Sequence, residues 1–434
     1  MGGGSGLWRL DSSEDSADAH SLIKGAAMLK ILYIGEDASA YKNKGRAYDV
    51  ELIKELKKSV RLVVYTRDRD VSKMTIKDHD DIRYYIVHPT KRKIRFHLLD
   101  SIIKKLTGIR KLLSDCSDIR KILRSEKPDI IQAEGVIPYG LIAYLASKTA
   151  LFEPKIIVSA HLVDGLRIPF EYLDRQKGKI VDFLSSVVLS NCHIRANSFL
   201  TKEWLMKSGG IGKKIEVIVP NIDSDFFPSG RQIKTERHCP ARFIAVSRYT
   251  PMKALDILFS SFELVLRQLP DAILHIYGQD RNISGIGDYR TYLQKLIDTK
   301  KLGNNINLFH EINHSDVPNK IEEYDFNICS SHGETLNLVV VEACTVGVPS
   351  IVTEYCGIST WVRKYKTGII TKCNAKSLSE SLLQAAKMDS NEYKKMSENC
   401  YDLIKEFFPS CVASQLLDFY HQVLLDGYEK NTTC

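Results

Sequence analysis

Two glutamates eight residues apart, Glu334 and Glu342, lie in the stretch of sequence best suited to chemistry. A short apolar run at 326–329 precedes them and a Gly-Val-Pro sequence at 347–349 follows, which predicts a strand, a polar turn and a helix that then stops. With Glu334 at the helix start, the two carboxylates would be about 12 Å apart along the axis. This length suits a nucleotide-sugar, with a hexose at one end and a ribose at the other. Two solvated surface carboxylates are the alternative.

A diphosphate would fit between these glutamates, because the start of a helix offers free N–H groups and a positive dipole end. Arg248 and Lys253 lie in or just after the loop that follows a predicted strand at 242–246. Two cations there would neutralise a diphosphate. Read alone, they are equally consistent with exposed charges on a loop.

The elements that would position these residues are short apolar strands alternating with helices. The chain begins with a strand, a polar loop containing Gly45, a helix at 47–58 and a second strand, which is typical of a doubly wound α/β domain. Gly45 either lets the backbone approach a ligand or simply makes a turn. The predicted strands of the first half are 30–35, 61–65, 129–133, 155–159, 187–189 and 215–219.

His161 follows the predicted strand at 155–159 and therefore lies at a carboxyl end, where such sheets bind ligands. A lone histidine is more often structural, but this position also suits a functional role, so both interpretations stay open.

A polar stretch with Pro228 and Gly230 predicts a linker at 221–241, after which the α/β pattern starts again. With 434 residues and 44% hydrophobic content, the chain can bury two cores. We expect a first domain at 28–220 and a second at 242–410. Residues 1–27 are glycine-rich, then acidic and serine-rich, and are interpreted as tag or linker.

Residues 91–113 carry eight Lys or Arg against one acid, and their apolar residues follow helical spacing. Such a basic amphipathic helix either lies on an anionic membrane surface or packs its apolar stripe against the sheet. Nucleic acid is not expected as a partner, because Phe96 is the only Phe, Tyr or Trp there for base stacking.

The ten cysteines form no Cys-x-x-Cys pair and no zinc-type cluster, so no metal and no cofactor are expected. Several lie in apolar runs, as reduced cysteines of a cytoplasmic protein do. No apolar run approaches 18 residues, so we expect no membrane span. The net charge of +8 allows anionic partners without identifying one.

The second half of the chain, over nearly all of 241–390, resembles the retaining GT-B glycosyltransferases of family 4. Arg248 with Lys253 resembles the Arg and Lys pair that binds the donor diphosphate in that family. Glu334 and Glu342 match its E-x7-E segment. The resemblance implies two Rossmann-like doubly wound domains facing across a cleft, with a C-terminal helix within 411–434 that crosses back to the first domain.

The resemblance also implies roles for the site residues. Glu334 would bind hydroxyls of the donor sugar, and Glu342 would bind the ribose. His161 lies where the family keeps a histidine near the transferred sugar. The residues implied for catalysis are His161, Arg248, Lys253 and Glu334, and those implied for donor binding are Gly45, Arg248, Lys253, Glu334, Thr335, Leu336, Asn337, Leu338 and Glu342.

The sequence departs from the family at Asn337, which replaces a glycine, although Asn tolerates a positive φ better than most residues. Thr360 stands where a glutamate is common.

Together, these features predict a retaining transferase that moves a sugar from a UDP-sugar or GDP-sugar to a hydroxyl, without a metal. We expect the acceptor to be a lipid-linked or cell-surface glycan, and the protein to be cytoplasmic or peripheral on the inner face of the membrane. An epimerase acting on nucleotide-sugars with the same fold, or a non-catalytic subunit that binds sugar nucleotides, is the alternative.

Overall fold

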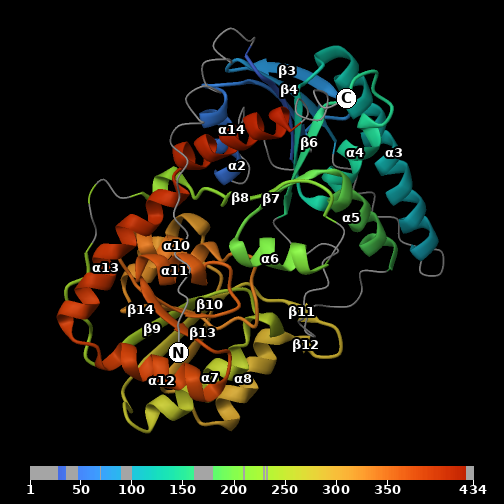
Figure 1. Ribbon diagram of the computed structural model, residues 1–434. Coiled ribbons are helices and arrows are strands. Elements are labelled where there is room, and N and C mark those ends of the chain that lie inside the picture. Colours follow the sequence, from blue (N-terminus) through green and yellow to red (C-terminus); the bar gives the residue numbers. More distant parts are fainter. Residues whose placement is uncertain are drawn as a thin grey trace, which may run out of the picture.

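The computed structural model describes residues 28–35, 47–68, 70–88, 100–160, 179–208, 211–227, 230 and 233–426, with the backbone alone at 47–49, 100–108 and 179. These residues form two lobes, each built around a sheet with helices on both faces (Figure 1). Gly45, His161 and the basic residues 91–99 lie outside the described residues.

The first lobe contains an eight-stranded sheet in the order β3-β4-β2-β1-β5-β6-β7-β8. All its pairings are parallel except the β3–β4 hairpin, which the sequence did not predict. After β1 the chain adds strands toward one edge of the sheet, and from β5 it adds them toward the other edge, so the direction of strand order reverses between β1 and β5. The strands are β1 Lys30–Ile34, β2 Arg61–Arg67, β3 Thr75–His79, β4 Ile82–Val87, β5 Ile130–Glu134, β6 Lys155–Ala160, β7 His193–Ala196 and β8 Ile215–Val217.

The predicted strand at 187–189 is wrong, because these residues belong to a helix, α5 (Lys179–Asn191). A short apolar run does not distinguish a strand from the buried side of a helix. The strand that follows is β7, and two of its four residues, His193 and Arg195, are polar but buried. Its composition therefore gave no apolar signal.

Helices cover both faces of the first sheet. On one face lie α3 (Asp100–Glu126), α4 (Leu141–Ser147) and α5. On the other lie α2 (Ala47–Leu56) and α14 (Pro409–Leu425), where Leu416 and Phe419 of α14 share a buried cluster with Ile53 of α2. The last described helix thus crosses back to the first lobe, as expected (Figure 1). A further helix, α6 (Phe199–Ser208), lies at the edge of this lobe that faces the second.

The second lobe has a six-stranded, wholly parallel sheet in the order β13-β10-β9-β14-β15-β16. Its direction of strand order reverses between β9 and β14. One face is covered by α7, α8 and α12, and the other by α9 and α10. The elements are β9 Arg242–Val246, α7 Leu255–Leu266, β10 Ile273–Gly278, β11 Asn282–Ile283, β12 Gly287–Asp288, α8 Tyr289–Thr299, β13 Ile306–His310, α9 Val317–Glu322, β14 Phe326–Cys329, α10 Leu338–Thr345, β15 Ser350–Thr353, α11 Ser359–Tyr365, β16 Gly368–Thr371, α12 Ala375–Lys387 and α13 Ser390–Ile404.

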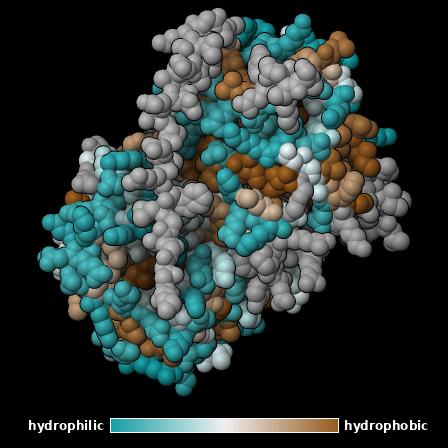
Figure 2. All heavy atoms as spheres, in the orientation of Figure 1, coloured by the Kyte–Doolittle hydropathy of each residue, from teal (hydrophilic) through white to brown (hydrophobic). Residues whose placement is uncertain are grey.

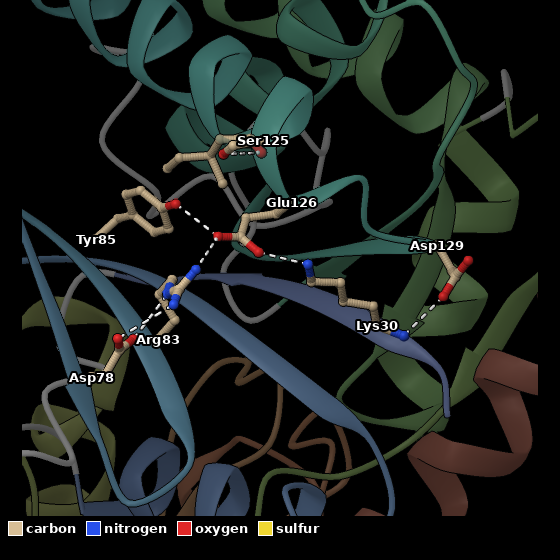
Figure 3. Close-up of polar contacts among 8 residues, drawn as sticks. Lys30, Asp78, Arg83, Tyr85, Ser125, Glu126 and Asp129 are labelled. Atoms are coloured by element: carbon tan, nitrogen blue, oxygen red, sulfur yellow. Dashed lines mark hydrogen bonds and ion pairs between the residues drawn. The ribbon is translucent and has the colours of Figure 1, made fainter. Parts of the chain in front are cut away.

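A polar cluster around the buried Glu126 carboxylate fixes the end of α3 to the amino edge of the first sheet (Figure 3). The Glu126 carboxylate accepts hydrogen bonds from Lys30 Nζ at 2.6 Å, Tyr85 Oη at 2.8 Å and Arg83 Nη1 at 3.2 Å. The backbone N–H of Lys30 donates to Asp129 Oδ2 at 2.8 Å. Although burial raises the pKa of Glu126, these hydrogen bonds hold it below its usual value. The cluster therefore joins α3 to β1 and β4 with a charged carboxylate.

In the part of the chain that the structure describes, every helix is too short or too polar to cross a bilayer.

Candidate active site

The topology of the second sheet places the loops that carry Arg248, Lys253 and Glu334 at the same edge of the sheet. Strands β9 and β14 are parallel neighbours at the point where the direction of strand order reverses. Arg248 and Lys253 follow β9, and Glu334 follows β14. In α/β sheets, ligands bind in the crevice outside the carboxyl ends of the strands at such a point. The two cations and the glutamate therefore border the expected ligand crevice.

Lys253 and Glu334 form an ion pair through Lys253 Nζ and Glu334 Oε1. The two side chains are only 13% and 17% exposed, so Glu334 is not a solvated surface carboxylate. Ser331 Oγ donates to the same oxygen of Glu334 at 2.7 Å. Burial alone would lower the pKa of Lys253, but the carboxylate of Glu334 reverses this effect and raises it. The lysine therefore stays charged inside the crevice.

The sequence suggested that Glu334 lies at the start of a helix, but in the structure it does not. Helix α10 begins at Leu338, and residues 334–337, here named the donor turn, precede it. The Glu334 N–H donates to Tyr355 O at 3.1 Å, and its carbonyl accepts from Gly357 N at 2.9 Å. The separation of about 12 Å was predicted for a continuous helix from Glu334 to Glu342, and this premise is wrong because only residues from Leu338 onward are helical.

Asn337 is the last residue of the donor turn, and its backbone conformation explains why α10 starts at the next residue, Leu338. Its φ of 89° lies in the left-handed region, which Asn tolerates better than most residues. Its Nδ2 donates to Cys329 Sγ at 2.8 Å. Within the described part of the chain, the N–H groups of Leu336, Asn337 and Leu338 have no backbone acceptor. These donors, next to the positive end of α10, form a suitable place for an anion.

Glu342 lies in the second turn of α10, and its side chain is 5% exposed, so it too is not a solvated surface carboxylate. His314, in the short 3-10 helix His314–Asp316, places Nε2 3.2 Å from Glu342 Oε1. This hydrogen bond raises the pKa of His314, although burial opposes the shift. The ring of Phe226 lies 4.9 Å from the imidazole, measured between ring centroids.

Arg248 is exposed, and its side chain has no hydrogen bond or ion pair with any residue that the structure describes. It follows β9 by two residues, and Ser247, beside it, pairs its N–H with Tyr277 O at 2.9 Å. The backbone on one side of Arg248 is therefore fixed, while its guanidinium group is available to a ligand.

Sequence reasoning missed three residues that contact the site. Ser331 lies three residues before Glu334, a spacing that allows a turn-type contact, and this was its only signal in the sequence. His314 comes from a different loop, and only the packing of α9 against α10 brings it to Glu342. Thr201, from the first lobe, donates through Oγ1 to Thr335 O at 3.3 Å.

No group of three or more His, Cys, Asp or Glu side chains in the described residues has a geometry that could hold a metal ion. The absence of a metal requirement stays a prediction.

The chain matches two glycosyltransferase families. Residues 228–403 match the family "Glycosyl transferases group 1", and residues 30–186 match "Glycosyl transferase 4-like". One subunit of the phosphatidylinositol N-acetylglucosaminyltransferase from Homo sapiens is 25% identical over 218 residues, which is 50% of this chain and 43% of that protein. The chain therefore spans less than half of the length of this relative.

Solved structures are similar over nearly the whole chain. A sucrose-phosphate synthase from Thermosynechococcus elongatus matches with a TM-score of 0.69 and 14% identity, covering 92% of this chain and 100% of that one. A structure described as trehalose-6-phosphate from E. coli bound with UDP-2-fluoro glucose matches with a TM-score of 0.65 and 11% identity, covering 91% and 99%. At these identities the likeness shows the fold. The two family matches show that the chain belongs to the group 1 glycosyltransferases, and the structural likeness shows that it has the GT-B fold.

Proposed function

We propose that this protein transfers a sugar from a nucleoside-diphosphate sugar to a hydroxyl acceptor, with retention of anomeric configuration. The observation that carries the proposal is the buried pair of Lys253 and Glu334 at the reversal point of the second sheet. A buried ion pair that borders open N–H donors at a helix start is arranged for a ligand with both anionic and hydroxyl groups.

The diphosphate binds between the loop after β9 and the donor turn. Arg248 and Lys253 supply positive charge, and the N–H groups of Leu336, Asn337 and Leu338 supply hydrogen bonds. These groups stabilise the charge that develops on the leaving diphosphate, which is a large contribution to catalysis in a water-excluded site. With these cations in place, the reaction needs no metal. His161 and Gly45, outside the described residues, stay assigned to the sugar and the donor by the family resemblance.

The two glutamates bind the two ends of the donor. Both contacts of Glu334 with described residues use Oε1, so Oε2 is available to hydroxyls of the sugar. Glu342 uses Oε1 for His314, and its second oxygen is available to the ribose. The structure described for the E. coli neighbour contains UDP-2-fluoro glucose, which supports a UDP-sugar as the first donor to test.

A thermal-shift screen with UDP-, GDP- and ADP-sugars tests the donor site. We expect one donor class to raise the melting temperature of the wild type, and Lys253→Ala and Arg248→Ala to abolish this shift. Lys300→Ala is the matched control, because Lys300 pairs with Glu263 at 2.7 Å on the surface of the same lobe. Equal shifts in the wild type and both site variants would contradict the proposed site.

Retention rests on the resemblance to family 4, in which the leaving phosphate assists attack from the same face of the sugar. Proton NMR of the fresh product gives its anomeric configuration. We expect the configuration of the donor, and an inverted product would overturn this part of the proposal.

We further propose a lipid-linked acceptor at an anionic membrane, on its cytoplasmic face. Ile109 and Leu113 of α3 are 55% and 64% exposed, so the apolar stripe does not pack on the sheet at these positions. Ile180 and Phe183 of α5, which like α3 packs beside α4, are 75% and 67% exposed. Figure 2 shows hydrophobic atoms on the surface of this part of the first lobe. The human relative is named for phosphatidylinositol, which is itself a lipid.

Sedimentation with anionic vesicles at low salt tests the membrane surface. We expect the wild type to pellet and the double variant Ile109→Ser/Leu113→Ser to pellet less. Ile76→Ser is the control, because Ile76 is 56% exposed on β3, at the edge of the same sheet. A wild type that stays in the supernatant, or equal pelleting of all three proteins, counts against this partner.

A further inference from the structure

The start of helix α6 contacts the donor turn from the opposite lobe. Thr201 Oγ1, in α6 of the first lobe, lies 3.3 Å from Thr335 O in the second lobe. Within the first lobe, the single hydrogen of the Thr201 hydroxyl is shared with Asn197 Oδ1 at 2.8 Å, and the Thr201 N–H donates to Ser198 Oγ at 3.0 Å. Asn197, Ser198 and Thr201 are all buried. The hydroxyl is therefore held in place by its own lobe where it reaches the second.

Gly357 shows how closely the lobes approach at this point. A Cβ atom on Gly357 would lie 2.0 Å from Thr335 O and 2.5 Å from Ser198 Oγ, distances at which atoms overlap. The N–H of Gly357 donates to Glu334 O at 2.9 Å. The donor turn therefore lies between the segment after β15 and the start of α6, and both contact its backbone.

The hydrogen bond to Thr335 O has a geometric consequence, because the carbonyl of Thr335 and the N–H of Leu336 belong to one planar peptide unit. In a trans peptide these two groups point in opposite directions. A carbonyl held toward α6 therefore aims the N–H of Leu336 away from α6. This N–H is one of the three donors assigned above to the diphosphate.

We propose that Thr201 is a positioning residue of the donor site: its hydroxyl fixes the 335–336 peptide from the opposite lobe and so aims the Leu336 N–H at the donor. The proposal rests on the function proposed above. It means that the donor site of the second lobe is complete only while the first lobe is docked against it. Small misplacements of a binding group reduce rates strongly, so one hydroxyl at this position has a measurable effect on turnover.

Three variants test the proposal. Thr201→Val keeps the shape and removes the hydroxyl, Thr201→Ser restores the hydroxyl, and Ser208→Ala is the control. Ser208 Oγ donates to Leu205 O at 2.7 Å, so the control removes a hydroxyl-to-carbonyl bond in the same helix but within one lobe. Thr201→Ala is the replacement if the valine variant does not fold.

Hydrogen exchange of the protein without donor, read by mass spectrometry over residues 333–340, needs no activity. We expect Thr201→Val to exchange about fivefold faster in this segment, as the loss of one hydrogen bond implies, with an unchanged melting temperature. Thr201→Ser and Ser208→Ala should exchange like the wild type. Unchanged exchange in Thr201→Val, or equal acceleration in Ser208→Ala, would overturn the positioning role.

Kinetics with the donor found in the thermal-shift screen give the second measurement. We expect Thr201→Val to raise the donor KM and lower kcat/KM about tenfold, and Thr201→Ser to restore both. If Thr201→Val exchanged faster but had unaltered kinetics, Thr201 would hold the turn without aiding donor binding, and its role in the donor site would be refuted. A wild type without donor binding would refute the proposed function, and the exchange result would still decide whether Thr201 holds the turn.

Discussion

Glu126 and Glu334 are both largely buried carboxylates paired with a lysine, one in each lobe, yet their surroundings differ. Glu126 uses both oxygens, one for Lys30 and the other for Tyr85 and Arg83. Glu334 uses one oxygen for both of its partners among the described residues. Glu126 lies at the amino edge of its sheet, and Glu334 lies beyond the carboxyl edge, where α/β sheets bind ligands. A satisfied carboxylate holds a fold together, whereas one with a spare oxygen is equipped to bind a ligand.

The largest expected effect that distinguishes the two is on activity. Glu334→Gln keeps the shape but removes the charge opposite Lys253 and weakens the contact with the sugar. We expect kcat/KM to fall by about two to three orders of magnitude, the scale of losing one electrostatic contact to the transition state. Initial rates with the identified donor measure this. A loss of kcat/KM of less than tenfold would mean that Glu334, like Glu126, holds the fold together and does not bind the donor.

The reciprocal change acts on stability. Glu126→Gln leaves the largely buried Lys30 without its anion, whereas the exposed Arg83 keeps Asp78 at 2.9 Å, so we expect the free energy of unfolding to fall by about 3 kcal/mol. Urea titration measures this, and kcat/KM below the transition should stay within twofold of the wild type. If Glu126→Gln instead lost activity without losing stability, the assignment of Glu126 to the fold would be wrong.

A smaller effect is expected at Asn337, where the donor turn departs from its family. Asn337→Ala keeps a non-glycine residue at a φ of 89° and removes the contact with Cys329, so we expect stability to fall by about 1 kcal/mol. Asn337→Gly relieves the backbone strain and should stay within about 0.5 kcal/mol of the wild type. Similar losses in both variants would mean that the side-chain contact, and not the backbone, decides this position.

The smallest effect concerns the second glutamate of the site and depends on pH. The pKa of His314 is raised in the folded protein, so its pairing with Glu342 stabilises the fold fully below the ordinary value of 6.5. This stabilisation is lost as the pH rises through the raised pKa. Because the His314 side chain is 62% exposed, we expect the stability difference between wild type and His314→Gln to be below about 1 kcal/mol at pH 6 and to disappear as the pH rises through the raised pKa of His314. A difference that grew with pH would contradict this pairing.

The sequence predicted the two doubly wound sheets and the placement of Lys253 and Glu334 at neighbouring loops, because strand patterns and loop positions are local signals. It failed at 187–189, where an apolar run lay in a helix, and at the β3–β4 hairpin, whose outer strand is wholly exposed and therefore lacks an apolar pattern. The helix start at Leu338 depends on the backbone of Asn337, which composition does not fix. His314 and Thr201 reach the site only through tertiary packing, so no spacing in the sequence points to them.

The crossing helix α14 has a consequence for how the chain folds during synthesis. One face of the first sheet is covered by α2 and by α14, and α14 is the last helix that the structure describes. The ribosome completes β1 to β8 long before it reaches residues 409–425. Until then, the apolar side chains that later contact Leu416 and Phe419 have no cover. We expect the first lobe to depend on chaperones in this interval, and a fragment that stops at residue 408 to aggregate where the full chain folds.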